Sequence, residues 1–320
     1  MPPEAITLAD IQKARQRVTP CVRRTPQVIS ATLCEQFKTN VYCKLELFQK
    51  TGSFKVRGVF NKILSLPPEV RNTGLVAISG GNHGLAVAYA ARALDLKGLV
   101  LMPESAPQHY IDAARGYGAE VDFAKSASEA FSQVEELERG GWHYLHPFDD
   151  PAIMAGQGTM GLEILEDTPQ VTDVIVSIGG GGMMTGVATA IKTLKPAVRI
   201  WGVETEGADC MSQSLAAGEI MTLNGTTSVA RALGAAAPSP MTFAAAKNLL
   251  QGVTVVSDDD ALDAMHFILE RMKLLTEPAA ACTLAAADRL RGQFAPDRHV
   301  VLVLGGGNVS LDVLQSFDPD

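Results

Sequence analysis

The chain has 320 residues, of which 47% are hydrophobic and 19% charged, a composition that supplies a sizeable core and excludes a disordered chain. The formal net charge is −8, with 27 basic residues spread thinly, which argues against nucleic acid or an anionic membrane surface as a partner. No apolar run approaches the ~18 residues that a membrane-spanning helix needs. The composition therefore predicts a soluble globular protein.

The five cysteines are scattered and odd in number, and no two have the C-x-x-C spacing. This usage argues against a disulfide framework and a thiolate zinc site, and it is typical of a reducing compartment. Residues 1–10 carry acids, and they lack the basic start and apolar stretch of a signal peptide. We therefore expect a cytoplasmic protein.

Short apolar runs without alternation, typical of strands buried on both faces, recur along the chain. The predicted strands are Leu75–Ile78, Gly98–Leu101, Val174–Ile178, Ile200–Val203 and Val300–Leu304. Helical patterns lie between them, at Gly84–Leu94, Ser126–Arg139, Gly182–Leu194, Asp258–Lys273 and Ala279–Arg291. Alternation on this scale predicts an α/β protein whose parallel sheets carry helices on both faces. The segment Gly140–Pro151 is predicted to cross between two lobes.

Three glycine clusters each follow a predicted strand and are expected to open a helix: Ser79–Gly84, Gly179–Gly182 and Gly305–Asn308. Such loops let backbone N–H groups converge on an anion, and the helix N-terminus adds partial positive charge. A single cluster would be explained by close packing at a tight turn. Three clusters in one chain favour a ligand crevice at the strand ends.

Two common ligands of glycine loops are disfavoured. A G-x-G-x-x-G pattern occurs at Gly156, Gly158 and Gly161, but no strand precedes it, as the dinucleotide fingerprint requires. No glycine cluster is followed by Lys-Ser or Lys-Thr, so a P-loop for ATP is absent.

Lys55 is a candidate nucleophile. Taken alone it would be an ordinary solvated lysine, but the polar turn Thr51–Ser53 is predicted to cap the helix that carries Phe54, Lys55 and Arg57. An amine pressed against an aromatic ring and small polar groups can lose its charge and become nucleophilic. A nucleophilic lysine together with a tetraglycine phosphate cradle suggests pyridoxal phosphate.

Five segments, in order, resemble the motif set of the serine/threonine dehydratase and serine racemase family, which are pyridoxal-phosphate enzymes of the tryptophan-synthase-β fold (fold type II). They are Lys44–Gly58, Ser79–Gly84, Ser177–Gly186, Glu277–Pro278 and Gly305–Asn308. The resemblance covers about residues 5–315. It implies a two-lobed enzyme, with a small domain at 50–150 inserted into a large domain at 1–49 and 151–320.

The resemblance also implies how the cofactor is bound. Lys55 would hold its aldehyde covalently and, once released by substrate, act as the base at Cα. Phe54 would pack against the pyridine ring, Asn82 would hydrogen-bond the ring 3-hydroxyl oxygen, and Glu277 would approach the ring. The phosphate would be bound by Gly179, Gly180, Gly181 and Gly182 with Met183, and Gly305 would lie at the position that faces the pyridine nitrogen.

The substrate carboxylate would be bound by the turn from Ser79 through Gly80 to His83. Ser79 and the N–H groups of Gly81, Asn82 and His83 are its expected ligands. For His83 an alternative is equally open, namely a histidine packed at the start of a helix.

Two departures from the family pattern bear on the reaction. Racemases carry a serine where this chain has Gly80, and that serine reprotonates the opposite face of Cα. Family members usually place serine, threonine or cysteine where this chain has Gly305, so a side-chain partner for the pyridine nitrogen is missing. Both departures disfavour racemisation and tolerate loss of a β-leaving group, although Gly305 also leaves a non-catalytic cofactor-binding protein open.

A third departure concerns a metal. Some relatives bind Mg²⁺ or Ca²⁺ at the stretch that here carries Glu204, Ala208 and Cys210. A thiol is a poor ligand for these cations, although Asp209 or Glu206 could take its place. We therefore favour no metal, which leaves Mg²⁺ or Ca²⁺ as an alternative, and we otherwise expect Glu204 to be a solvated acid.

Together these features predict a pyridoxal-phosphate-dependent ammonia-lyase. It would eliminate water from a β-hydroxy amino acid, L-serine or L-threonine first, to give a 2-oxo acid and ammonia. Hydroxyaspartate, another β-substituted amino acid, and serine racemisation remain alternatives. The family also implies a homodimer.

Overall fold

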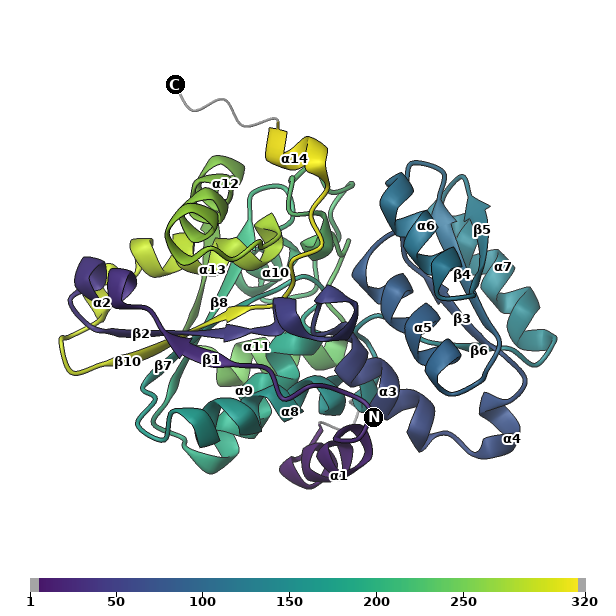
Figure 1. Cartoon of the computed structure of the whole chain (residues 1–320), viewed down its shortest axis with the longest axis horizontal. Coiled ribbons are helices and arrows are strands. Elements are labelled where there is room, and N and C mark those ends of the chain that lie inside the picture. The colour runs from purple at the N-terminus through teal and green to yellow at the C-terminus, as the bar shows by residue number, and fades with distance from the viewer. Residues whose placement is uncertain (1–5, 316–320) are drawn as a thin grey trace.

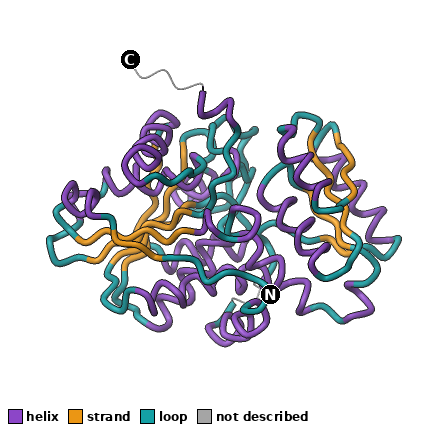
Figure 2. Tube along the Cα trace, viewed as in Figure 1, coloured by secondary structure: helices purple, strands orange, loops and turns teal. Residues whose placement is uncertain are grey.

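The computed structural model of the chain describes residues 6–315 (Figure 1). Residues 1–5 and 316–320 lie outside the described residues. The N-terminal segment 1–10, in which no signal peptide is expected, is therefore described only from residue 6. Two separate groups of strands, each flanked by helices, make up the fold (Figure 2). No helix within residues 6–315 is long and apolar enough to cross a membrane.

The larger sheet has six strands in the order β1-β2-β10-β7-β8-β9. All neighbouring pairs are parallel except β1 with β2. Parallel neighbours need long crossover connections, which helices supply. The strands are β1 (Gln27–Ile29), β2 (Asn40–Leu45), β7 (Asp173–Ser177), β8 (Arg199–Thr205), β9 (Gly252–Val256) and β10 (His299–Leu304).

The smaller sheet has four parallel strands in the order β5-β4-β3-β6. Helices α3, α5 and α6 pack on one of its faces and α7 on the other. The strands are β3 (Leu75–Ile78), β4 (Gly98–Pro103), β5 (Glu120–Ala124) and β6 (His143–Tyr144).

The helices of the described residues include two short departures from α geometry that matter below, the 3-10 turn Lys50–Gly52 and the π-helical turn Ile268–Met272. The α-helices are α1 (Leu8–Val18), α2 (Ala31–Phe37), α3 (Lys55–Ser65), α4 (Pro68–Arg71), α5 (Asn82–Ala93), α6 (Gln108–Gly116), α7 (Ala127–Arg139), α8 (Pro151–Asp167), α9 (Gly182–Leu194), α10 (Cys210–Ala217), α11 (Pro240–Leu249), α12 (Asp258–Phe267), α13 (Pro278–Arg289) and α14 (Leu311–Gln315).

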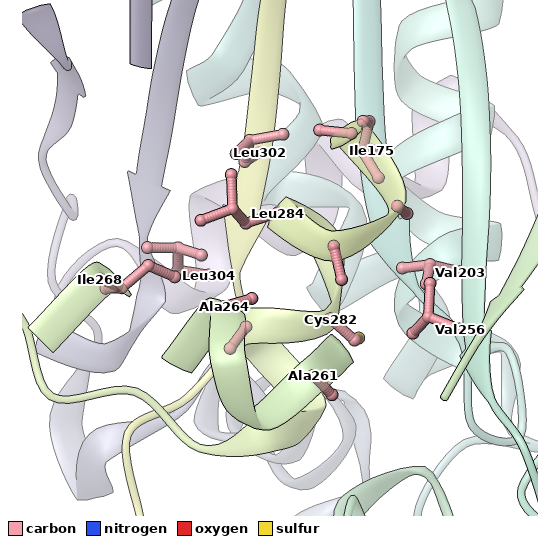
Figure 3. Packing of buried hydrophobic residues seen from close by; sticks show 14 of the residues in the cluster. Ile175, Val203, Val256, Ala261, Ala264, Ile268, Cys282, Leu284, Leu302 and Leu304 are labelled. Carbon is pink, nitrogen blue, oxygen red and sulfur yellow. The ribbon is translucent and has the colours of Figure 1, made fainter. Parts of the chain in front are cut away.

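Strand β10 shows why the larger sheet is covered on both faces. Successive side chains of a strand point to opposite faces, and every residue from Val300 to Leu304 is apolar and buried. Leu302 and Leu304 pack into a core with α12 and α13 (Figure 3), to which α2 also contributes, whereas Val301 and Val303 pack into a core with α8, α9 and α11. An uninterrupted apolar strand therefore requires helices on both sides.

The five strands and five helices expected from the sequence all form. The predicted bounds of β3 and α9 agree with the structure, and most other ends differ by one to three residues. Two expectations were wrong in detail. The helix expected at Asp258–Lys273 stops at Phe267 and continues as the π-helical turn, and the Gly305 cluster does not open a helix directly, because α14 begins only at Leu311.

The segment Gly140–Pro151 contains β6 of the smaller sheet and ends at the first residue of α8, which packs on the larger sheet. All strands of the smaller sheet lie between residues 75 and 144, inside the range predicted for the small domain. Helix α3 packs against the smaller sheet through Val56 and Phe60, and Arg57 of the same helix reaches α8 at Glu163. The boundaries at 50 and 150 stay a prediction.

Candidate active site

One cavity brings together residues from the ends of β7 and β10 and from the starts of α3, α5, α9 and α13. It contains all ten residues expected to bind a cofactor. The lining residues are Phe54, Lys55, Asn82, Phe148, Ser177, Gly179, Gly180, Gly181, Gly182, Met183, Ala232, Leu233, Glu277, Ala279 and Gly305. Because the carboxyl ends of parallel strands share one edge of a sheet, the loops that follow them meet there.

Lys55 is the first residue of α3, and its side chain is partly buried. Its Nζ donates a hydrogen bond to the Pro147 carbonyl oxygen at 3.0 Å and lies 5.3 Å from the centre of the Phe54 ring. Burial lowers the pKa of Lys55 to about 8, and the nearby Glu277 carboxylate partly opposes that change. A larger fraction of the amine is therefore neutral near pH 7 than for a solvated lysine.

The turn before Lys55 does not cap α3, contrary to the sequence-based expectation. The segment Lys50–Gly52 forms a 3-10 turn in which Thr51 has φ 60°, and Ser53 is then extended and pairs with Gly306. The residue at the N-cap is Phe54, which makes no side-chain capping bond; its backbone N–H donates to the Gly305 carbonyl at 3.0 Å. The start of α3 is thus held by the loop after β10.

Buried ion pairs of Arg57 also fix the position of α3. The Arg57 guanidinium is fully buried and donates to both carboxylate oxygens of Glu46, at 2.8 Å each, and to those of Glu163, at 2.8 and 2.9 Å. The Lys44 ammonium lies 2.6 Å from Glu163. Bidentate charge-assisted bonds are strong and directional, so they orient the helix that carries Lys55.

Asn82 and Glu277 meet inside the cavity. The Asn82 Nδ2 donates to Glu277 Oε1 and Oε2 at 2.9 and 3.0 Å, and the Asn82 Oδ1 accepts from Asn308 Nδ2 at 2.7 Å. Burial raises the pKa of Glu277 to about 7, against the opposing effects of Asn82 and Lys55. Asn308 was named only as the end of a motif in the sequence, although its place directly after the glycines could have marked it.

The tetraglycine loop depends on its glycines. Gly181 has φ +92°, a conformation that L side chains rarely adopt, and a β-carbon on Gly180 would lie 2.2 Å from the Phe148 ring. Helix α9 begins at Gly182, so the loop's N–H groups lie at a helix N-terminus, where anions are favoured. Phe148 was not identified from the sequence, because nothing local relates it to a loop more than thirty residues away.

The residues expected at the substrate carboxylate form the turn between β3 and α5. The Gly81 N–H donates to Ser79 Oγ at 3.2 Å. His83 is buried, and its Nε2 lies 2.7 Å from the Leu145 carbonyl oxygen; burial, and secondarily Lys55, lower the pKa of His83 to about 3. That contact is the one expected of a packed, neutral histidine. None of Ser79, Gly80, Gly81 and His83 lines the cavity described above.

The two unusual glycines have different surroundings. A β-carbon on Gly305 would lie 3.4 Å from Phe54 and 3.6 Å from Met183, which is close to ordinary contact. A β-carbon on Gly80 would lie 3.0 Å from Pro103 and 3.3 Å from Ala106, which is tight. Packing alone therefore does not require glycine at position 305.

The metal candidates do not form a cation site. Glu204 is fully buried, not solvated as expected, and its two oxygens accept the backbone N–H groups of Met211 at 2.9 Å and Ser212 at 2.7 Å, in the first turn of α10. Burial raises the pKa of Glu204 to about 7, against those hydrogen bonds. Cys210 Sγ is directed at the Gly179 carbonyl, 4.0 Å away, and within residues 6–315 no three His, Cys, Asp or Glu side chains are grouped to hold a metal.

Comparison with known proteins identifies the family. Residues 18–306 match the family described as "Pyridoxal-phosphate dependent enzyme". The chain belongs to this family. It is 38% identical to the protein named L-threonine dehydratase catabolic TdcB of Staphylococcus aureus strain USA300, over 96% of this chain and 90% of the relative. It is also 38% identical to the L-threonine ammonia-lyase of Thermotoga maritima, over 97% of this chain and 77% of that protein.

The fold is shared with the solved structure of maize serine racemase, which superposes with a TM-score of 0.93 at 33% identity and covers 98% of this chain and 97% of the other. The predicted family, fold class and pyridoxal-phosphate dependence are thereby confirmed. The cavity fits the cofactor: it offers a lysine amine of lowered pKa, apolar side chains at Phe54 and Met183, and a glycine loop at a helix N-terminus.

Proposed function

We propose that this pyridoxal-phosphate enzyme is an ammonia-lyase that eliminates water from a β-hydroxy amino acid, with L-serine and L-threonine as the first substrates to test. The observation that carries the proposal is the Lys55 amine. It lies in the cavity with a lowered pKa. The position at which racemases carry a second acid is Gly80 in this chain, and glycine has no side chain to donate a proton. The two relatives named for threonine dehydration support the same reaction.

When bound, pyridoxal phosphate withdraws electrons from the substrate and makes the Cα–H bond acidic. Lys55 would hold the cofactor aldehyde, the N–H groups of Gly179–Gly182 with Met183 beside them would hold its phosphate, and Phe54 would pack against its ring. The Asn82 amide would exchange one of its two bonds to Glu277 for one to the ring oxygen, and Glu277 would lie near the ring, where its negative charge favours the protonated form of Lys55.

Lys55 Nζ then acts as the base that takes the proton from Cα. The substrate carboxylate would be bound by Ser79 Oγ and the N–H groups of the turn Gly81–His83, at the N-terminus of α5. His83 would contribute its backbone, because its ring is already engaged with Leu145. Proton removal and departure of the β-hydroxyl need no acid on the opposite face of Cα, whereas racemisation does.

We also propose a cytoplasmic homodimer. All five cysteines are free in the structure, with three of them buried, as expected in a reducing compartment. The dimer follows from the family resemblance, and light scattering during size-exclusion chromatography tests it by giving the mass of the particle. A mass equal to one chain would contradict it.

The function is tested by measuring ammonia and 2-oxo acid from serine, threonine, hydroxyaspartate and 3-phenylserine with the cofactor-loaded protein. We expect turnover of at least serine or threonine, and loss of both the visible cofactor band and turnover in Lys55→Ala. Lys62→Ala, in the same helix but outside the cavity, is the matched control and should retain both. A loaded protein that releases ammonia from none of these substrates would contradict the proposal and favour a binding role.

A further inference from the structure

A second cavity, of about 790 Å³, lies beside the cofactor cavity and shares Ala232, Glu277 and Ala279 with it. Four segments line it: the start of α6 with the residues before it, the loop 229–232, residues 277–279 at the start of α13, and residues 308–311 with 313. Pockets of this size hold ligands much larger than a methyl group. The side chains of serine and threonine would leave most of it empty.

Two aromatic rings form the α6 side of this cavity. The rings of His109 and Tyr110 have centroids 4.3 Å apart. The Tyr110 hydroxyl donates to the Asn308 carbonyl oxygen at 2.8 Å, and a β-carbon on Gly81 would lie 4.0 Å from Tyr110 Cζ. The Tyr110 ring therefore reaches from the cavity to the turn that we assign to the substrate carboxylate.

Small and apolar residues also line this cavity. Ala232 and Ala279, which also line the cofactor cavity, leave room there, and Ala230, Val229 and Val309 supply further apolar surface. Aromatic rings packed against one another and against aliphatic side chains gain both buried area and favourable ring geometry. This combination suits an aromatic group.

The cavity offers weaker interactions to a charged β-substituent. Arg231 also lines the cavity, but its side chain is exposed to solvent. Exposed ion pairs gain little because water screens them. Selection of a second carboxylate, as in hydroxyaspartate, therefore has weaker support than selection of an aromatic ring.

We propose that the second cavity binds the β-substituent of the substrate, that the preferred substrates are β-hydroxy amino acids with an aromatic β-substituent, and that Tyr110 determines this specificity. The inference rests on the proposed lyase function. For 3-phenylserine the Cα–H and Cβ–O bonds break and water leaves. Water then displaces ammonia, so that the net products are phenylpyruvate and ammonia.

The test compares kcat/KM for 3-phenylserine, threonine and serine. We expect 3-phenylserine to be at least as good a substrate as threonine. Val229→Trp should lower the ratio of kcat/KM for 3-phenylserine to that for serine at least tenfold, because the new ring occupies the cavity. Leu194→Trp replaces a side chain of similar exposure outside the cavity and should leave the ratio unchanged.

If Val229→Trp fails to fold, Tyr110→Leu is the second probe and should lower the same ratio at least fivefold. Turnover of serine or threonine without turnover of 3-phenylserine would overturn this inference and leave the lyase function standing. Ammonia from no substrate would instead contradict the lyase function. A preference for hydroxyaspartate that disappears in Arg231→Gln would show that the cavity selects charge, and would overturn the aromatic assignment.

Discussion

The side-chain amide of Asn82 donates to both carboxylate oxygens of Glu277, at 2.9 and 3.0 Å, and so joins the start of α5 to the start of α13 inside the cofactor cavity. Glu277 is in turn one of the causes that set the pKa of Lys55. The Glu277 carboxylate, at the start of α13, thus interacts with both Asn82 at the start of α5 and Lys55 at the start of α3.

Glu277→Gln should lower the pKa of Lys55, because it removes the negative charge that favours the ammonium form. Only the neutral amine attacks an aldehyde, so uptake of pyridoxal phosphate by the cofactor-free protein should rise with pH through about 8 in the wild type. In the variant the midpoint should move to lower pH. Stopped-flow absorbance at a series of pH values measures it, with the exposed Glu69→Gln as control; a midpoint that stays in place or rises would count against this coupling.

Gly305→Ser and Gly180→Ala should differ sharply in stability. A β-carbon at position 305 meets Phe54 at 3.4 Å, and we expect a change in the free energy of unfolding of less than ~1 kcal/mol. A β-carbon at position 180 meets the Phe148 ring at 2.2 Å, and overpacking of this kind costs about 1–3 kcal/mol. Urea unfolding compares the two.

Gly305→Ser should also shift the absorbance of the bound cofactor, because it adds a hydrogen-bonding side chain at the position that we expect to face the pyridine nitrogen. An unchanged spectrum and unchanged kcat would mean that position 305 does not contact the ring. Equal stability losses for the two glycine substitutions would show that the loop around Phe148 yields more easily than its contacts indicate.

Arg57→Met should destabilise the protein by about 3–5 kcal/mol, since it leaves the carboxylates of Glu46 and Glu163 buried beside each other without their shared partner. Arg57 holds the pKa of Glu163 below its ordinary value of 4.5, against the effect of burial. The stabilisation is therefore present above that value and is lost as the pH falls toward the lowered pKa. Urea unfolding between pH 7 and pH 3 should show that the free energy of unfolding falls with pH in the wild type and falls less in the variant. A variant as stable as the wild type would refute the role of Arg57 in holding Glu46 and Glu163.

His83→Gln should make stability less sensitive to acid. Burial holds the pKa of His83 at about 3, below its ordinary 6.5, so between these values the unfolded chain binds a proton that the folded chain does not, and stability falls as pH falls. From pH 7 to pH 5 this costs about 2 kcal/mol in the wild type. The variant keeps a donor near the Leu145 carbonyl and should lose about 2 kcal/mol less over the same interval; parallel losses in both proteins would place the titration elsewhere.

The sequence by itself determined the elements that local patterns encode. The unbroken apolar run of β10 and the glycine-to-helix junction at Gly182 depend on neighbours along the chain, and both formed as predicted. Lys55 and the glycine clusters were recognisable as candidates for the same reason, because the residues that indicate their chemistry are neighbours in the sequence.

Only the tertiary structure decided which distant residues meet. Asn82 and Glu277 are 195 positions apart, and no periodicity of either segment indicates that the start of α5 meets the start of α13. Phe148 against Gly180, Tyr110 beside Asn308, and Glu204 closed by the amides of α10 depend equally on strand order and helix packing. Local pattern determines the conformation of a segment, whereas its long-range partners are set by how all the segments pack together in the fold.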